Sequence, residues 1–433
     1  MKVFENIVCA FCGSLCDDIM LEVEGNAISK VRGGCAISRR RFLGPIDREA
    51  PRIDGREVGF EEALDAAVEI LAKARHPLIY GLSSTSSEAQ AAAVKLGETL
   101  GASVDSTSSV CHGPGTVAKQ LVGLSTCTLG EVKNRADVVV FWGCNPVEAH
   151  PRHFSRYSVQ VKGLHIEEGR RDRKVIVADV RKTATARAAD IFLQVAPNGD
   201  FQVLTALRAV INGNKLREET FGGIDPEEIQ NVCDVLQSAE YGVFFFGMGL
   251  TMTQGTHYNV RQALSLVRDL NQKTAFAVIP MRGHGNVAGA ETVLTWQTGY
   301  PFGINFSRGY PRYNPGEFTV TDLLCRREVD AAVIVASDPQ ATLPARAANC
   351  LAEIPTVVID PYYSATARLA RVFIPSAPVG LATSGTAYRM DQVPLPLKKV
   401  IDSKYPSDHD ILLAIDKGVA ECSASKAALS MIL

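Results

Sequence analysis

The chain has 433 residues, of which 46% are apolar and 7% aromatic. This is enough material for two or three domain cores of ordinary size. Its 45 Lys and Arg against 47 Asp and Glu leave a net charge of -2, so no bulk electrostatic attraction favours nucleic acid or an anionic membrane. The longest apolar runs, such as residues 138–142 and 243–246, fall far below the roughly 18 residues that span a bilayer. Integral membrane insertion is therefore excluded.

The cysteine pattern favours a reducing compartment. Eleven cysteines, four of them in the first 35 residues, do not resemble a secreted disulfide framework. The first residues lack the apolar stretch of a secretory signal, so we expect the mature chain to start here and to stay in the cytoplasm. Residues 38–43 look like a twin-arginine export motif, but they lie inside the chain and precede no apolar stretch. We interpret them as a solvated basic loop.

Up to about Pro51 the sequence is short, cysteine-bearing and rich in turns, with strands expected near residues 19–23 and 27–31. Beyond it, short β-branched runs alternate with amphipathic helices, which is typical of parallel α/β units. Residues 76–81 predict a strand, 88–100 a helix, and the residues near 102–104 a second strand. The same plan returns with a strand at 241–246, a helix near 259–271 and a strand at 275–279.

The chain also matches itself in two places. Residues 137–146 resemble 332–339, each an apolar strand that runs into a turn ending in proline. Residues 184–192 match 365–373, each after a buried strand that ends at Asp179 or Asp360. Matching offsets predict one unit used twice; a chance likeness between Rossmann-like turns is the alternative.

We therefore predict an α/β fold with a small amino-terminal domain (residues 1–50) and two pseudo-symmetric, doubly wound (Rossmann-like) domains. The first of these is discontinuous and joins residues 51–130 to 290–385, and the second spans 131–289. Residues 386–433 would pack back on the core. Crevices at the carboxyl ends of parallel strands bind nucleotide-like ligands, so two related domains predict two related sites.

Four cysteines near the start can converge on one centre. Cys9, Cys12 and Cys16 lie in one tight loop, and Cys35 follows an intervening hairpin. Structural zinc commonly takes two C-x2-C pairs, whereas three closely spaced ligands and one distant ligand suit a cubane iron-sulfur cluster. We favour a 4Fe-4S cluster over zinc, so residues 1–50 are predicted to be an iron-sulfur domain. Disulfides or inert thiols fit less well.

A fifth thiol, Cys111, stands beside His112, before the amphipathic residues 116–122. Pro114 suits an early helical position, so the thiol should lie near a helix amino end, where backbone dipoles favour thiolate. Cys111 is thus a candidate metal ligand or nucleophile, with a buried structural cysteine as the alternative. A Cys-His hydrolase would leave the four-cysteine cluster without a purpose. An electron relay beside a thiolate-bound redox metal accounts for both the four-cysteine cluster and Cys111.

Residues 281–289 form a glycine-rich loop with one arginine, Arg282. Its glycines would let backbone amides approach a bound group closely. Along the chain, this loop follows the cysteine cluster, Cys111 and turns at residues 143–146, 179–183, 197–200 and 247–249. That order resembles the molybdopterin oxidoreductase superfamily, which includes the formate dehydrogenases.

Within this superfamily the chain looks like the catalytic B subunits of formylmethanofuran dehydrogenases over essentially its full length. The most specific stretches are residues 9–18, 108–114, 143–152, 279–286, 310–316 and 385–390. The resemblance implies an oxidoreductase that reversibly reduces CO2 to formate at a tungsten or molybdenum centre, in a C1 pathway of the methanogenesis type. Which of the two metals is used stays open, because both accept dithiolenes and one cysteine.

The resemblance also implies the roles of individual residues. Four thiolates would bind the 4Fe-4S cluster, those of Cys9, Cys12, Cys16 and Cys35. Cys111 would bind the tungsten or molybdenum, with His112 and Arg282 as the catalytic groups beside it. Arg282 suits a carboxylate product, and His112 suits proton relay. Two molybdopterin guanine dinucleotides would lie in loops that contain Asn145, Asp179, Gly199, Asp200, Gly247, Gly249 and Asp360.

Two features depart from the superfamily pattern. Longer members close a carboxyl-terminal barrel domain over the pterins, which this sequence lacks, so we expect a separate pterin-capping subunit. A lysine often follows the last cluster cysteine, and here we expect one of Arg39, Arg40 and Arg41 to replace it. Further implied partners are an amidohydrolase-like subunit that condenses formate with methanofuran, and polyferredoxin-type iron-sulfur subunits.

Three other functions compete. The first is a non-redox subunit of a formyltransferase/hydrolase complex, against which the five candidate ligand cysteines argue. The second is a formate dehydrogenase that uses free formate and another acceptor. The third is a structural electron-transfer subunit with a cluster and no active metal.

Overall fold

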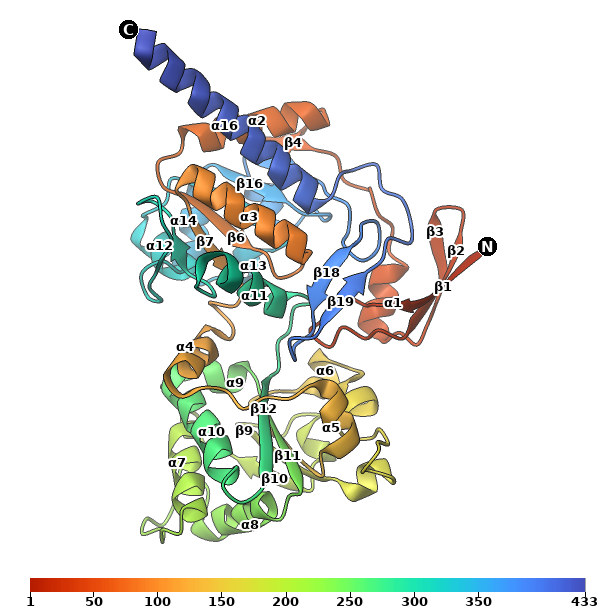
Figure 1. Cartoon of the computed structure of the whole chain (residues 1–433), viewed down its shortest axis with the longest axis vertical. Helices are drawn as coiled ribbons and strands as arrows, with labels where there is room; N and C mark the ends of the chain where they lie inside the picture. Colours follow the sequence, from red (N-terminus) through yellow and green to blue (C-terminus); the bar gives the residue numbers. More distant parts are fainter. Residues whose placement is uncertain (433) are drawn as a thin grey trace.

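Two separate β-sheets, each with helices packed on it, account for most of the chain. The computed structural model describes residues 1–432, and the side chains up to residue 425. In Figure 1 one sheet lies in the upper half of the molecule and the other in the lower half, with a small antiparallel sheet at one side. Among the described residues, none of the helices combines the length and apolar character needed to cross a membrane.

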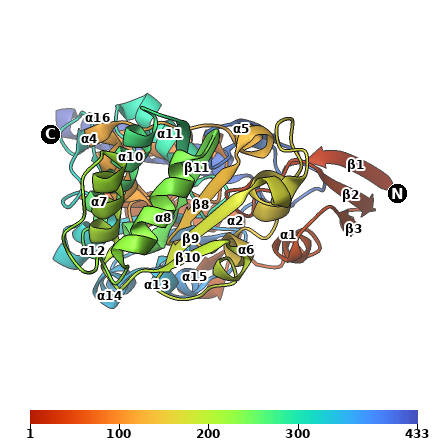
Figure 2. The same ribbon diagram turned by 90° about the horizontal axis from the view of Figure 1, so that it is seen from below.

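The lower sheet has five strands, all parallel, in the order β10-β9-β8-β11-β12. Their bounds are Val138–Trp142 (β8), Lys174–Asp179 (β9), Ile191–Gln194 (β10), Tyr241–Phe246 (β11) and Ala275–Pro280 (β12). Successive side chains point to opposite faces, so Val138 and Val140 pack under the helices α7 (Asp200–Ile211), α8 (Pro226–Gln237) and α10 (Thr256–Leu270). Figure 2 shows these helices against the sheet from below.

The upper sheet has nine strands, in the order β14-β13-β7-β6-β15-β16-β17-β4-β5. The five central strands are parallel: β6 (Pro77–Gly81), β7 (Ser103–Ser106), β15 (Ala331–Val335), β16 (Thr356–Ile359) and β17 (Val372–Ile374). The edges are antiparallel additions: β4 (Arg52–Ile53), β5 (Arg56–Glu57), β13 (Ile304–Asn305) and β14 (Arg312–Tyr313). Helices α2 (Phe60–Lys73), α3 (Ser87–Leu100) and α16 (Asp408–Ile432) cover one face, and α12 (Val320–Arg326) and α14 (Ala345–Glu353) the other.

The central strands of the two sheets have the same spatial arrangement: β17-β16-β15-β6-β7 corresponds to β10-β9-β8-β11-β12, except that β6 and β7 come before β15 in the chain, whereas β11 and β12 come after β10. Helix α6 (Pro146–Ala149) follows β8 as α13 (Pro339–Thr342) follows β15. Their N-caps have nearly identical backbones, with φ -124° and ψ 71° at Asn145 and φ -123° and ψ 70° at Asp338. Thr185 Oγ1 donates to Asn145 Oδ1 at 2.7 Å, and Thr366 Oγ1 donates to Asp338 Oδ1 at 2.6 Å.

The amino-terminal residues form an antiparallel sheet of β1 (Lys2–Ile7), β2 (Ile19–Glu24) and β3 (Ala27–Arg32), which confirms the strands predicted at 19–23 and 27–31. The interpretation of residues 38–43 as a loop is wrong, because α1 (Ala36–Phe42) covers most of them. The helix forms because the segment is amphipathic. Ser38 and Phe42 lie four residues apart on one helix face and are buried, while the arginines face the solvent.

The remaining elements connect these parts. They are α4 (Gly113–Val122), α5 (Leu129–Arg135), α9 (Met248–Thr251), α11 (Val287–Thr298), α15 (Ala365–Leu369), the hairpin β18 (Gly385–Tyr388) with β19 (Pro394–Leu397), the 3₁₀ turns Gly169–Asp172 and Ala186–Ala188, and a π-helical turn, Phe154–Ser158. Asn286, just before α11, joins three of the segments. Its buried amide donates to Thr85 O at 2.9 Å and accepts from Tyr388 N at 2.7 Å.

Replacing Asn286 by Ala should lower the free energy of unfolding by about 2–4 kcal/mol, because it leaves buried backbone groups of two other segments without partners. Denaturant unfolding of the purified protein measures this loss. Asn314→Ala is the matched control, since Asn314 donates only to the exposed Glu317, and it should change stability by less than about 0.5 kcal/mol. Equal effects of the two substitutions would contradict the account.

Candidate active site and cofactor pockets

The four amino-terminal cysteines line one small cavity, together with Ser14, Ser38 and Arg152. The loop is closed by the backbone bond from Cys9 N to Cys16 O, 2.8 Å, and Cys35 is the N-cap of α1. Within residues 1–432, however, no three His, Cys, Asp or Glu side chains are placed to hold one metal ion. A single zinc ion at about 2.3 Å from each sulfur would draw its ligands to within about 4 Å of one another. In a cubane each thiolate binds a different iron, so the thiols stand farther apart.

Burial raises the pKa of the Cys9 and Cys12 thiols and raises that of Cys16 to about 11, although the nearby Arg152 acts to lower it. Such thiols stay protonated at neutral pH unless a cation replaces the proton. Arg152 pairs with Asp18 at 2.6 Å and also hydrogen-bonds Cys16. The site is therefore four soft donors in a buried cavity with one guanidinium beside them.

The cysteine loop is packed directly on the arginine-glycine loop. Gly13 N donates to Gly283 O at 3.0 Å. A Cβ on Gly13 would lie 2.2 Å from Arg282 O, and a Cβ on Gly285 would lie 1.9 Å from Ala10 O. Only glycine allows backbone to approach backbone this closely. The four-cysteine cavity and Arg282 are thus neighbours through a single layer of main chain.

Cys111 ends the loop after β7, and α4 begins at Gly113 with His112 as its N-cap, which confirms the predicted helix start. The loop is organised by Asp105, a fully buried carboxylate that sequence reasoning missed. It accepts from Ser109 Oγ at 2.7 Å, Gly303 N at 3.0 Å and Val320 N at 2.7 Å. Burial raises the pKa of Cys111 to about 11, while Arg282 acts in the opposite direction.

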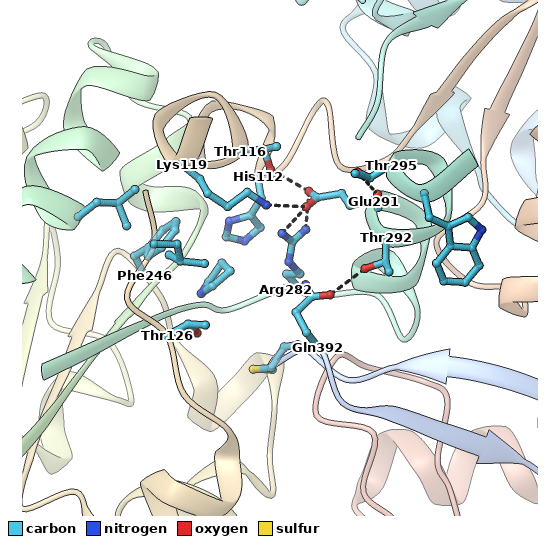
Figure 3. Close-up of a pocket in the computed structure, with 16 residues that line it drawn as sticks. His112, Thr116, Lys119, Thr126, Phe246, Arg282, Glu291, Thr292, Thr295 and Gln392 are labelled. Atoms are coloured by element: carbon cyan, nitrogen blue, oxygen red, sulfur yellow. Dashed lines mark hydrogen bonds and ion pairs between the residues drawn. The ribbon is translucent and has the colours of Figure 1, made fainter. Parts of the chain in front are cut away.

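Arg282 is buried and paired with a partner that the sequence did not reveal. Its two Nη atoms donate to the two carboxylate oxygens of Glu291 at 2.6 and 2.7 Å, a forked geometry shown in Figure 3. Ser108 Oγ and Thr116 Oγ1 donate to the same carboxylate. Glu291 lies on α11, nine residues beyond Arg282. Its neighbours in the sequence are mostly apolar, so the sequence does not indicate that it pairs with Arg282.

Burial acts to raise the pKa of Glu291, but Arg282 and the other donors bring it down to about 2. Both partners therefore stay charged at neutral pH. Since the pKa in the folded state lies below the ordinary 4.5, the contribution of the pair to stability is complete above pH 4.5 and is lost as the pH falls toward 2.

A pocket opens onto this pair. It is lined by His112, Arg282 and Glu291 at its base and by Lys119, Trp296 and Gln392 among others. His112 Nε2 lies 3.2 Å from Met281 O, so Nε2 carries the proton and Nδ1 is an acceptor. His112 Nδ1 and Arg282 Nε are buried and have no hydrogen-bond partner among the described residues. Unsatisfied buried groups of this kind are expected where a ligand binds.

The predicted cofactor residues of the lower sheet gather at the carboxyl ends of β8, β9 and β11, next to the point where the strand order reverses. Gly249 N donates to Gly143 O at 2.9 Å and Gly247 N to Trp142 O at 3.0 Å. Asp179 ends β9, and Gly199 is the N-cap of α7. Asn145 bonds Thr185, as described above.

Asp200 shares this loop cluster but is buried. Its Oδ1 accepts from Trp142 Nε1 at 2.7 Å, while its Oδ2 has no partner in the described part of the chain. Burial raises the pKa of this carboxyl. Asp200 therefore supports the loop through Trp142 and keeps one oxygen free.

Asp360, the predicted cofactor residue of the upper sheet, lines a second pocket, with Ala336, Asp338, Tyr362 and residues of the cysteine loop, Ala10 and Phe11. It accepts from Tyr362 N at 2.8 Å, and burial raises its pKa to about 8. Arg41 reaches this pocket from α1 and lies 4.8 Å from the Tyr362 ring centre. The pocket lies between the cysteine loop and the carboxyl ends of β15 and β16.

Known proteins resemble the chain in fold and in sequence. No family model matches the chain. A solved structure of the formyltransferase/hydrolase complex from Methylorubrum extorquens shares the fold, with a TM-score of 0.72, 23% identity and coverage of 87% of this chain and all of that one. Formate dehydrogenase H of Escherichia coli is 25% identical over 64% of this chain and 44% of its own length. In sequence the chain is thus related to oxidoreductases of the formate dehydrogenase type.

Within that class one similarity is much stronger. The chain is 48% identical to the B subunit of the tungsten-containing formylmethanofuran dehydrogenase 2 of Methanocaldococcus jannaschii, over 97% of this chain and 99% of that protein. The chain belongs to the family of formylmethanofuran dehydrogenase B subunits.

Replacing Gly13 by Ala should cost about 3 kcal/mol of stability or more, because the added Cβ must push the cysteine loop off the Arg282 carbonyl. The apparent melting temperature of the purified protein measures the loss. Gly283→Ala is the matched control in the same contact region, since its Cβ would meet nothing within 4 Å. A Gly13 variant as stable as this control would show that the two loops are not packed as described.

Proposed function

We propose that this chain reduces CO2 reversibly to formate, with two electrons and one proton for each CO2, and that the formate is condensed with methanofuran in a partner subunit. The observation that carries the proposal is the direct packing of the four-cysteine loop on the loop of Arg282, which also borders the Cys111 region. The loop that holds the electron donor would then pack directly on the loop that borders the reduction site. The strong similarity to a named formylmethanofuran dehydrogenase subunit supports the same activity.

We propose that Cys9, Cys12, Cys16 and Cys35 bind a 4Fe-4S cluster and that Cys111 binds tungsten or molybdenum. Four thiols that line one cavity, three of them from one tight loop and one from the start of α1, support the cluster over zinc. The name of the relative from M. jannaschii favours tungsten. When bound, the metal with its pterins would supply two-electron redox chemistry, and the cluster would pass electrons singly.

Two molybdopterin guanine dinucleotides would occupy the related crevices at the carboxyl ends of the two sheets. The free Oδ2 of Asp200 and the pocket of Asp360 support this assignment. The other loop residues proposed to contact them are Asn145, Asp179, Gly199, Gly247 and Gly249. Arg41, which lies between the cysteine loop and the Asp360 pocket, is our choice for the position that lysine often takes in the superfamily.

The chain's own residues shape the reduction site. Arg282 supplies a fixed positive charge in a buried pocket, where electrostatic interactions are stronger than in water. His112 presents Nδ1 as an acceptor, which can receive and return a proton. Lys119, partly exposed beside the pair at 4.0 Å from Glu291, adds positive potential that draws a small anion to the pocket.

The sheets support the proposed division into residues 1–50, 51–130 with 290–385, 131–289 and 386–433, because β6, β7 and β15 to β17 share one sheet and β8 to β12 the other. Helix α4 is the exception, since it packs on α10 of the lower unit. We propose that separate subunits supply the pterin-capping barrel, the amidohydrolase-like activity and further iron-sulfur clusters. A relative that was solved within a complex supports this assembly. Eleven free thiols support a cytoplasmic location.

Replacing Cys111 by Ser should abolish CO2 reduction in the purified complex, with turnover down by at least about a thousandfold, while the EPR signal of the reduced cluster is retained. The reason is that the serine hydroxyl is a poor substitute for a soft thiolate ligand. Cys233→Ser is the control, because Cys233 is buried among the apolar side chains of the lower unit's core. Intact turnover in the Cys111 variant would favour a structural electron-transfer subunit instead.

Replacing Cys12 by Ser should remove the cluster signal and lower the iron content of the protein while tungsten or molybdenum remains bound. Elemental analysis of anaerobically purified protein, together with EPR, measures both. Zinc in place of iron would refute the cluster, and the absence of both heavy metals from the wild-type complex would favour the non-redox alternative. The remaining alternative is a formate dehydrogenase that uses free formate and another acceptor. Activity measured with free formate alone is compared with activity measured with methanofuran and the partner subunits, and this comparison separates the two functions.

A further inference from the structure

One forked edge of Arg282, the one formed by its two Nη atoms, is already occupied. A guanidinium offers a carboxylate two parallel N–H groups, and in Arg282 both Nη atoms are bound to Glu291. Ser108 and Thr116 hold the Glu291 carboxylate from the other side. Arg282 and Glu291 are each only 3% exposed. A carboxylate product that reaches this arginine meets a carboxylate that is already there.

Glu291 does not occupy every donor of Arg282. Its Nε is buried and has no hydrogen-bond partner in residues 1–432, and the pocket that Arg282 lines also contains the partly exposed Lys119 and Trp296, which is 57% exposed. A small anion that enters this pocket meets a guanidinium with two of its five N–H groups taken by Glu291 and with its charge offset.

We propose that Glu291 is a positioning residue that sets the affinity of the site for its carboxylate product by occupying the fork of Arg282. It takes two of the five N–H groups of the guanidinium, and its negative charge offsets the positive charge that would otherwise bind formate tightly. Formate is then held weakly and leaves for the next step. This inference rests on the proposed function for the identity of the product.

Loss of the Glu291 charge should therefore tighten formate binding. In Glu291→Gln the neutral amide no longer cancels Arg282 and can yield the fork to formate. We expect the dissociation constant for formate to fall at least tenfold, which corresponds to about 1.4 kcal/mol. The kcat of CO2 reduction should fall with it, because product release slows, while the KM for formate in the reverse reaction decreases.

The binding test needs no turnover. The apparent melting temperature of the full cofactor-loaded complex is followed during titration with sodium formate, with sodium chloride as the ionic control. Without formate, Glu291→Gln should melt below wild type, because it leaves a buried cation unpaired. Formate should then raise its melting temperature at concentrations that leave wild type unchanged. Glu291→Asp, which retains the carboxylate, should lie nearer to wild type.

Glu353→Gln is the matched control. Glu353 makes the same kind of fork with Arg327, at 2.6 and 3.1 Å, but on the surface. Its response to formate should equal that of wild type.

An equal response of wild type and Glu291→Gln to formate, or an equal response to formate and chloride, would overturn the inference. If Glu291→Gln does not fold, Thr116→Val serves instead, since it removes one donor to Glu291 and should tighten formate binding about two- to threefold; unchanged binding would overturn the inference. An enzyme that binds formate as expected but does not reduce CO2 would refute the proposed function alone.

Discussion

The site depends on a contact between two stretches of main chain. The cysteine loop and the arginine-glycine loop touch at Gly13 and Gly285, where any side chain would collide with a carbonyl oxygen. The same region is held from behind by His150, whose Nε2 lies 2.8 Å from Arg282 O, and from the hairpin side by Met390 N, which donates to Gly13 O. The four-cysteine cavity cannot move relative to Arg282 without breaking these contacts. This rigidity suits electron transfer, for which separation must be fixed.

The second constraint is charge in a buried pocket. Arg282 and Glu291 are almost fully buried. In the interior of a protein an unpaired ion costs several kcal/mol. The ion pair and the hydroxyl donors of Ser108 and Thr116 offset that cost, and the pair as a whole is neutral. In the proposed function, the pair would keep a cation beside the reduction site without binding anions strongly. Both the folding stability and the proposed product affinity follow from this one interaction.

Much of the architecture could be predicted from the sequence, because periodicity reports burial directly. The strands at 76–81, 241–246 and 275–279 and the helices at 88–100 and near 259–271 are confirmed as β6, β11, β12, α3 and α10. The likeness of residues 137–146 to 332–339 corresponds to two turns with matching N-cap backbones. The helix within residues 38–43 is missed when only their charges are considered, because its signal is the spacing of Ser38 and Phe42.

Tertiary partners were beyond the reach of the sequence. Glu291 and Asp105 are ordinary acidic residues by composition, and only the folded chain shows that each is buried among donors from distant segments. Arg282 could be found from its loop, but the occupation of its fork depends on where α11 lies. Similarly, the sequence predicts that Asp200 lies in a cofactor loop, while its bond to Trp142 is seen only in the structure.

The most direct test is the X-ray absorption spectrum of the complex at the tungsten and molybdenum edges, compared between wild type and a variant without the thiol of residue 111. The account predicts a heavy metal bound by sulfur atoms of Cys111 and of the pterins, with one fewer sulfur neighbour in the variant. A spectrum that is identical in the two proteins, with the metal fully retained, would contradict it.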